Sequence, residues 1–130
     1  MKKSGQTLVE FALIIPLLAL VLFAIIQYAL IFNVFMTLRH AAQVTSRTLA
    51  LASTSTNTPT DIAKSALMPP LDPTNLVTPV GVDTNVTVGS APGVQVTLTY
   101  NMPLIIQFVV PNATGNTLTL TAVAVDRSFK

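Results

Sequence analysis

The chain has 130 residues, of which 51% are hydrophobic and only 9% are charged, whereas an ordinary soluble domain carries roughly 25% charged residues. This imbalance indicates contact with lipid, and the length leaves room for one domain or a small domain with an anchor. There is no cysteine and a single histidine, His40, which excludes a disulfide framework, a thiolate metal site and a histidine-based metal cluster. Lys2 and Lys3 account for the net charge of +2, because five basic side chains balance five acidic ones beyond residue 5. No cluster of basic and aromatic side chains favours nucleic-acid binding.

Residues 11–32, FALIIPLLALVLFAIIQYALIF, contain no charge and one amide, Gln27. About 20 apolar residues span the hydrocarbon core of a bilayer, whereas a secretory signal has a shorter apolar region followed by a cleavage site. The run therefore predicts an uncleaved transmembrane helix, and Pro16 within it predicts a kink. Lys2 and Lys3 favour a cytoplasmic N-terminus and an extracytoplasmic C-terminal part.

The helix is predicted to continue beyond the apolar run, because residues 33–52 contain no glycine or proline. A helix over residues 6–52 would be roughly 70 Å long. A stripe of mostly small side chains recurs at helical spacing in its outer half: Leu38, Ala41, Ala42, Thr45, Leu49 and Ala52. This stripe predicts close packing on another element.

Residues 53–79 are rich in small polar residues and proline, and they predict a linker. Within it, residues 61–68 predict a short helix with Thr60 as its N-cap. The remainder, residues 80–130, is predicted to form a small extracytoplasmic antiparallel β domain.

Alternation of apolar and polar residues predicts three strands, at residues 80–88, 94–102 and 118–122. Residues 89–93, GSAPG, suit a hairpin loop, and residues 112–116, NATGN, suit a turn before the third strand. A small sheet with one apolar face needs a cover, and the Ala-rich half of the helix supplies one. The predicted fold is α+β, a long N-terminal helix packed on about three antiparallel strands.

An apolar segment at residues 104–110, LIIQFVV, lies between Pro103 and Pro111. It fits a buried strand or core segment. It also fits an exposed patch that contacts another subunit or the membrane surface. The sequence leaves both interpretations open.

The polar residues predict no enzyme, no metal and no cofactor. The carboxylates beyond the helix are scattered over turns and strand edges, so no pair is placed as an acid and a base. No glycine-rich phosphate loop is present. We therefore expect no small-molecule substrate.

The N-terminal residues KKSG, followed by QTLVEF and an apolar helix, resemble a class III, prepilin-type signal. The resemblance implies that a membrane peptidase removes residues 1–5 by cutting after Gly5. Gln6 would then carry the new amino terminus, with Glu10 at the fifth position of the mature chain. A pairing of Glu10 with the terminus of a neighbouring subunit would set the register of assembly.

Glu10 is followed by Phe11, which resembles the Flp and TadE branch of these proteins. Residues 37–52, the VQVTLTY segment at 94–100 and the LTLTA segment at 118–122 are also similar to TadE-like proteins. The outer helix departs from the family in lacking a polar, glycine-containing stretch, and major Flp pilins are much shorter. The resemblance implies a minor pilin or pseudopilin of a tight-adherence (Tad/Flp) secretion system.

The implied partners are the prepilin peptidase, the membrane, and other pilin or Tad assembly subunits packed helix to helix. The implied location is the cytoplasmic membrane, single-pass, with possible incorporation into an extracellular pilus. Two alternatives remain: a single-pass anchored protein whose β domain binds a partner, and a structural subunit of the filament.

Overall fold

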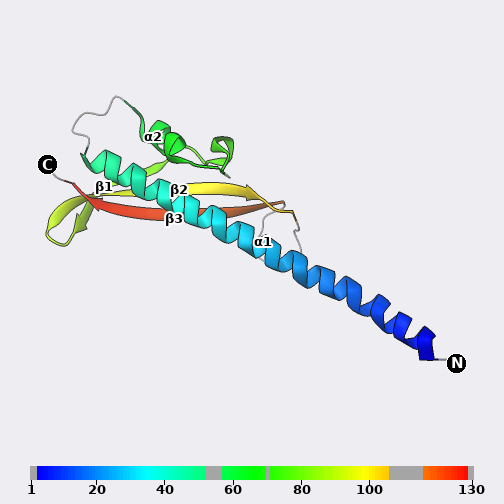
Figure 1. Ribbon diagram of the computed structural model, residues 1–130. Coiled ribbons are helices and arrows are strands. Elements are labelled where there is room, and N and C mark those ends of the chain that lie inside the picture. The colour runs from blue at the N-terminus through cyan, green and yellow to red at the C-terminus, as the bar shows by residue number, and fades with distance from the viewer. Residues whose placement is uncertain (1–2, 52–56, 70, 106–115, 129–130) are drawn as a thin grey trace.

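A computed structural model describes residues 3–51, 57–69, 71–105 and 116–128 of the chain. One long helix lies across a three-stranded antiparallel sheet with strand order β1-β2-β3 (Figure 1). The elements in chain order are α1 (Lys3–Leu51), α2 (Pro59–Ala66), the 3-10 helix η1 (Pro73–Asn75), β1 (Gly81–Val88), β2 (Ala91–Pro103) and β3 (Thr117–Arg127). The predicted α+β fold, with a long helix packed on about three strands, is confirmed.

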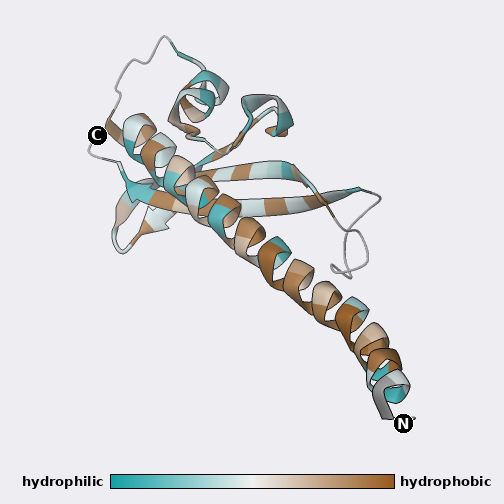
Figure 2. Ribbon diagram, turned by 45° about the vertical axis from the view of Figure 1, so that its right-hand side comes forward, coloured by the Kyte–Doolittle hydropathy of each residue, from teal (hydrophilic) through white to brown (hydrophobic). Residues whose placement is uncertain are grey.

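Helix α1 has 49 residues, which corresponds to a length of roughly 70 Å. It begins at Lys3, three residues before the predicted start, and it continues on both sides of Pro16. Figure 2 shows that its N-terminal half is mostly hydrophobic, with hydrophilic residues close to the N-terminus, whereas its C-terminal half alternates between polar and apolar residues. The two halves therefore have different surroundings: the first projects away from the sheet and the second covers it (Figure 1).

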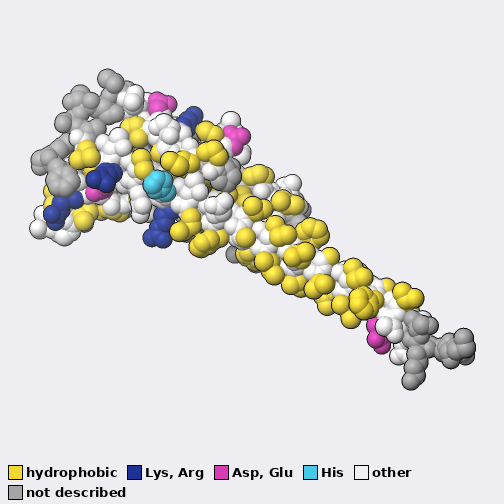
Figure 3. Space-filling view, viewed as in Figure 1, with side chains coloured by type: hydrophobic (Ala, Val, Ile, Leu, Met, Phe, Trp, Pro, Cys, Tyr) yellow, Lys and Arg dark blue, Asp and Glu magenta, His cyan; other side chains and the backbone are white. Residues whose placement is uncertain are grey.

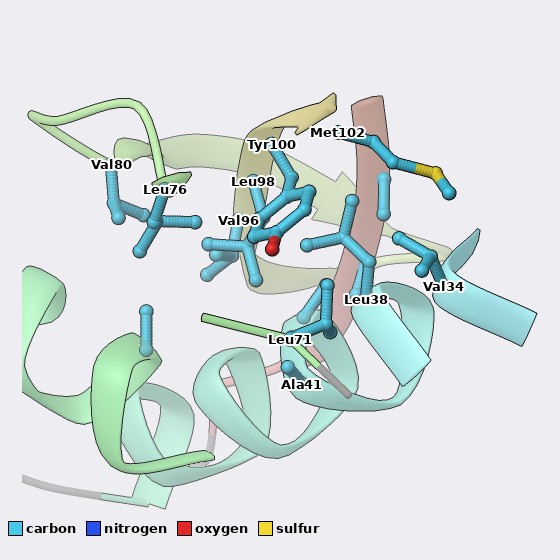
Figure 4. Close-up of a cluster of buried hydrophobic side chains, with 14 of the residues drawn as sticks. Val34, Leu38, Ala41, Leu71, Leu76, Val80, Val96, Leu98, Tyr100 and Met102 are labelled. Carbon is cyan, nitrogen blue, oxygen red and sulfur yellow. The ribbon is translucent and has the colours of Figure 1, made fainter. Parts of the chain in front are cut away.

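The core lies between the C-terminal half of α1 and one face of the sheet (Figure 4). Alanines on both sides of this contact, Ala41 and Ala42 on α1 with Ala122 and Ala124 on β3, are buried. Small side chains let the helix approach the sheet closely. The larger buried side chains are Val34 and Leu38 on α1 with Val94, Val96, Leu98, Tyr100 and Met102 on β2.

The predicted stripe on the outer helix is confirmed where the structure describes it. Leu38, Ala41, Ala42 and Thr45 are buried, Leu49 is half-buried, and Ala52 lies outside the described residues. The hydroxyl of Thr45 is buried but satisfied, because it donates to the Ala41 carbonyl oxygen at 2.8 Å. Threonine is small enough for this packed stripe, and its hydroxyl is not left unpaired.

The β1–β2 hairpin is tighter than predicted. Val88 pairs with Ala91, so the loop is the two residues Gly89 and Ser90 rather than residues 89–93. Gly89 has a φ of 67°, and glycine at the first loop position is typical of a type II′ turn. The predicted five-residue loop is wrong because Pro92 and Gly93 already pair with β1.

A β-bulge interrupts β1. Asp83 pairs with Gln95 and Val86 pairs with Gly93, so two residues of β1 face one residue of β2. The Asp83 carboxylate accepts a hydrogen bond from the Asn85 backbone N–H at 2.8 Å within the bulge. Since paired residues share a face of a sheet, the bulge places Val86 on the face opposite that of Val82.

Strand β3 runs to Arg127 and is longer than the predicted 118–122. Its pairing with β2 is continuous from Thr117 with Pro103 to Arg127 with Gly93. The predicted turn at 112–116 lies almost entirely outside the described residues, and of the apolar segment 104–110 the structure describes only Leu104 and Ile105.

The short helix α2 begins earlier than predicted, and its N-cap is Thr58 rather than Thr60. Pro59 occupies the first helical position, which suits proline because its missing N–H would have no helical partner there. The Thr58 hydroxyl accepts a hydrogen bond from the Asp61 backbone N–H at 3.3 Å and donates to the Asp61 carboxylate at 2.7 Å. This pairing resembles a capping box.

The segment predicted as a linker also contributes to the core. Leu71 and Leu76 are buried, and Leu76 forms an isolated antiparallel bridge with Tyr100. The Val77 backbone N–H donates to the Thr99 carbonyl oxygen at 2.8 Å. These contacts bind the segment to the edge of β2 beyond the end of β1.

Candidate functional site

The N-terminal part of α1 is the most exposed apolar surface of the described chain. Every side chain described from residue 5 to residue 18 is exposed, and Figure 3 shows hydrophobic side chains along the visible face of the projecting helix. A helix that is hydrophobic all round is normally buried or lies in a membrane. Helix α1 is long and apolar enough to cross a membrane, and this surface is available to lipid or to other helices.

Glu10 is the only acidic residue in α1, and it is exposed. It directly precedes the apolar run, while Gln6 and Ile14 lie one turn away on the same face. A carboxylate at the centre of a membrane helix costs about 2.5–3.5 kcal/mol on insertion scales, and the cost falls toward the interface. In a membrane-spanning α1, Glu10 would lie near the interface, where a carboxylate is tolerated and where a cationic partner would stabilise it.

Gly5 lies in the first turns of α1, and nothing in the fold requires glycine there. Its φ is not in the left-handed region, and a Cβ at this position would meet nothing within 4 Å. Glycine lowers helix stability by roughly 1 kcal/mol relative to alanine. Gly5 therefore weakens the start of the helix and contributes nothing to packing. If glycine is required at this position, the requirement comes from another molecule that recognises it.

The other predicted site residues also lie on the open helix surface. Gln6 and Phe11 are exposed, and the helix continues without interruption through Pro16. No part of the described chain packs over Gly5, Gln6, Glu10 or Phe11, so the structure brings them together only as successive positions on one helix. Their roles in cleavage and register, and the kink at Pro16, stay predictions.

Gln27 is a residue whose burial the sequence did not reveal. It is only 2% exposed although it belongs to the apolar run. It continues the packed stripe toward the N-terminus at helical spacing, with Ile31, Val34 and Leu38. The signal was its chemistry, because a single amide in an apolar run marks the face that turns away from lipid.

A hollow of about 360 Å³ lies between α1 and the end of β2, lined by Leu30, Val34, Asp72, Asn75, Tyr100, Met102 and Pro103. The Asp72 carboxylate accepts hydrogen bonds from the Thr74 backbone N–H at 2.9 Å and from the Thr74 hydroxyl at 2.8 Å. These bonds lower the pKa of Asp72 below its usual value of 3.8, and the bond from the backbone N–H has the larger effect. The Tyr100 hydroxyl accepts from the Asp72 backbone N–H at 3.0 Å.

The arrangement has few features of a catalytic or metal centre. Across the described residues, no three histidine, cysteine, aspartate or glutamate side chains gather as they would around a metal ion. The feature that stands out is the exposed helix with one carboxylate at its beginning.

The sequence of that same helix resembles a known family. Residues 5–47 match the model of the TadE-like protein family. The resemblance to TadE-like proteins is thus confirmed over 43 of the 130 residues. No curated protein and no solved structure matches the chain.

The TadE-like segment begins at Gly5 and includes Gln6, Glu10, Phe11 and the whole apolar run. It also includes the outer helix as far as Arg47, where most of the residues that pack on the sheet lie. The sheet itself lies outside the TadE-like segment. The family likeness therefore concerns the apolar and the packing parts of α1, and it does not extend to the β domain.

Proposed function

We propose that the chain is a minor pilin or pseudopilin-like subunit of a Tad/Flp-type pilus assembly system. It is held in the cytoplasmic membrane by α1, with its N-terminus inside and its β domain outside. Prepilin peptidase cuts between Gly5 and Gln6. The exposed half of α1 then packs against the helices of other pilin or Tad subunits, and the chain itself performs no catalysis.

The observation that carries this proposal is the TadE-like match, which starts at Gly5 and extends along the exposed helix. Gly5 has no role in the fold, so its presence is explained by recognition outside the chain. A peptidase needs an extended substrate, and the first turns of α1 are a suitable place to unwind. The first backbone N–H groups of a helix lack partners, and Gly5 lowers the local helix stability further.

Glu10 has a physical use in such an assembly. The new amine of Gln6 and the Glu10 carboxylate are four residues apart, which is about 6 Å along the axis. A carboxylate from one helix and an amine from the next would attract each other in a low dielectric, whereas either alone would be penalised. Pairing between subunits would fix their stagger to about one helical turn.

One experiment tests cleavage and register together. The intact mass of the membrane protein is measured with and without the prepilin peptidase of the same cells. We expect a chain that begins at Gln6, and we expect residues 1–5 to persist without the peptidase or in a Gly5→Val variant. Ser4→Ala, which keeps the glycine, is the matched control and should be cut normally.

A second arm of the experiment uses Leu17→Cys, because the chain has no cysteine of its own and Leu17 is exposed. Disulfide-linked adducts with cysteines in neighbouring helices then report packing. Glu10→Gln should leave cleavage intact and lower adduct yield about tenfold if the pair contributes about 1.4 kcal/mol, whereas Glu10→Asp should retain more. An uncut chain in peptidase-positive membranes would contradict the proposal.

A further inference from the structure

One end of the sheet reaches the level at which α1 leaves the apolar run. Strand β2 ends and β3 begins at the end of the sheet that points along α1 toward its N-terminus (Figure 1). Met102 and Pro103 line a hollow together with Leu30 and Val34 of α1. Figure 4 shows Met102 and Val34 at the same end of the core. Leu30 precedes the end of the apolar run by two residues.

The packed stripe of α1 extends further still into that run. Gln27 is buried and Ile31 is half-buried, and both lie within residues 11–32. The run has 22 residues and a length of about 33 Å, close to the roughly 30 Å thickness of the hydrocarbon core. Its outer end at Phe32 therefore lies near the boundary of that core, and Gln27 lies about 8 Å inside.

At this end of the sheet, the residues that follow β2 expose a large apolar side chain. The Leu104 backbone N–H donates to the Asn116 carbonyl oxygen at 2.9 Å, which joins the two strand ends, and the Leu104 side chain is buried. The next residue, Ile105, is 74% exposed, and Pro103 is exposed as well. A large apolar side chain so exposed beside a membrane helix has a natural partner in lipid.

The charges of the sheet lie away from this end. Residues 102–105 and 116–118 carry none, whereas Asp126 and Arg127 are at the opposite end of β3 and Asp83 is in the bulge of β1. Asp72 is the acidic residue that lines the hollow, and its exposed carboxylate suits the polar headgroup layer. The sheet residues at the near end thus carry no charge, and Asp72 is the charged residue beside them.

We propose that the end of the sheet at residues 103–105, the membrane-proximal tip, rests in the outer leaflet of the bilayer, with Ile105 inserted between the lipids. The tip continues the lipid-facing surface of α1, and it gives the β domain a second point of attachment that fixes its tilt. The inference rests on the proposed insertion of α1. It goes beyond it, because a spanning helix by itself would allow the domain to stand clear of the bilayer.

The test uses single cysteines labelled with an environment-sensitive fluorophore in the full-length, otherwise cysteine-free chain. Ile105→Cys and Pro103→Cys probe the tip. Val125→Cys is the matched control, since Val125 is a β-branched residue on the same sheet that is 46% exposed near the far end. Leu18→Cys, in the middle of the apolar run, reports insertion of α1. The protein is reconstituted in phosphatidylethanolamine–phosphatidylglycerol vesicles that contain nitroxide-labelled lipids.

We expect shallow nitroxides to quench the two tip labels at least about twofold more than the Val125 label, as for groups held at the headgroup–acyl boundary. Deep nitroxides should quench the Leu18 label. Tip labels no more quenched than the Val125 label, with the Leu18 label quenched, would overturn the tip contact alone. An unquenched Leu18 label would overturn membrane insertion and the tip contact with it.

A contact between copies of the chain is the competing explanation for a shielded tip. Diluting the protein in lipid separates the two. Tip quenching that persists on dilution supports lipid as the partner. A tip label that nitroxides do not quench, and whose emission reports shielding from water only at high protein density, would overturn the proposal in favour of a protein interface.

Discussion

Thr58 stabilises α2 through two bonds with a single residue, Asp61, at the start of the helix. Replacing an N-cap threonine by alanine usually costs about 1 kcal/mol. We expect Thr58→Ala to lower the free energy of unfolding by about that amount, because Ile62 and Ala63 of α2 are buried in the structure. The measurement is urea unfolding of the full chain in detergent, followed by tyrosine fluorescence.

Thr60→Ala is the matched control for Thr58→Ala. Thr60 was the N-cap expected from the sequence, and it lies two residues farther along, inside the helix. Its replacement should change stability by no more than about 0.5 kcal/mol. A larger loss for Thr60→Ala than for Thr58→Ala would show that the helix begins where the sequence alone suggested.

Residue chemistry explains which sites the sequence could identify. Glu10 and Gly5 stood out because a carboxylate and a glycine are unusual before an apolar helix, and their roles stay predictions. The cap was misplaced because threonines occupy both 58 and 60 and only the helix start distinguishes them. The burial of Gln27 was not predicted, because its amide was the single indication of a packed face and the surrounding run has no polar face to confirm that orientation.

At the scale of elements, Gly93 of β2 pairs with β1 on one side and with β3 on the other. A Cβ at Gly93 would lie 2.6 Å from Val88 Cγ2 and 3.1 Å from the carbonyl oxygen of Asp126. Since overpacking typically costs 1–3 kcal/mol, we expect Gly93→Ala to destabilise the chain by about that amount. Urea unfolding of the full chain measures it.

A double mutant identifies the cause of the Gly93 effect. Val88→Ala removes the nearer clash but leaves the backbone oxygen of Asp126, so Gly93→Ala should cost less in that background without becoming neutral. Gly81→Ala is the control, because its Cβ would meet a side-chain carbon of Thr97 at 3.3 Å. Additive losses for Gly93→Ala and Val88→Ala would contradict the packing account.

The alternation of apolar and polar residues predicts some features of the sheet and misses others. Three strands were predictable, because alternation along residues 94–102 and 118–122 is regular. The bulge in β1 was not, since it changes the facing of Val86 while the letters continue to alternate. The hairpin was assigned too long a loop because Pro92 and Gly93 are typical loop residues, yet both pair with β1.

For the whole molecule, α1 has two parts, an exposed apolar half and an outer half that belongs to the core. The helix supplies one wall of the core through Val34, Leu38 and the alanines at 41, 42 and 50, and the sheet supplies the other. The sequence predicted this division, because the apolar run and the Ala-rich stripe are adjacent on one uninterrupted helix. It could not predict that the two overlap near Gln27, where the domain meets the end of the run.

This dual role predicts that the β domain depends on the outer half of α1. The fragment of residues 33–130 retains Val34 and the packed stripe, and we expect it to fold. The fragment of residues 57–130 leaves Val96 and Leu98 without their cover. Truncating one large buried side chain costs about 2–5 kcal/mol, and a whole domain is stable by only about 5–15 kcal/mol. We therefore expect the shorter fragment to unfold.

Amide dispersion in NMR spectra and cooperative urea unfolding distinguish the two fragments. A peptide of residues 33–52 added to the shorter fragment should restore dispersion, whereas the same peptide with Leu38→Asp should not, because Leu38 is completely buried. A well-dispersed, cooperatively unfolding 57–130 fragment would mean that the sheet is stable by itself. In that case α1 would be an anchor that merely touches a finished domain, and the tilt of that domain would depend on the membrane-proximal tip alone.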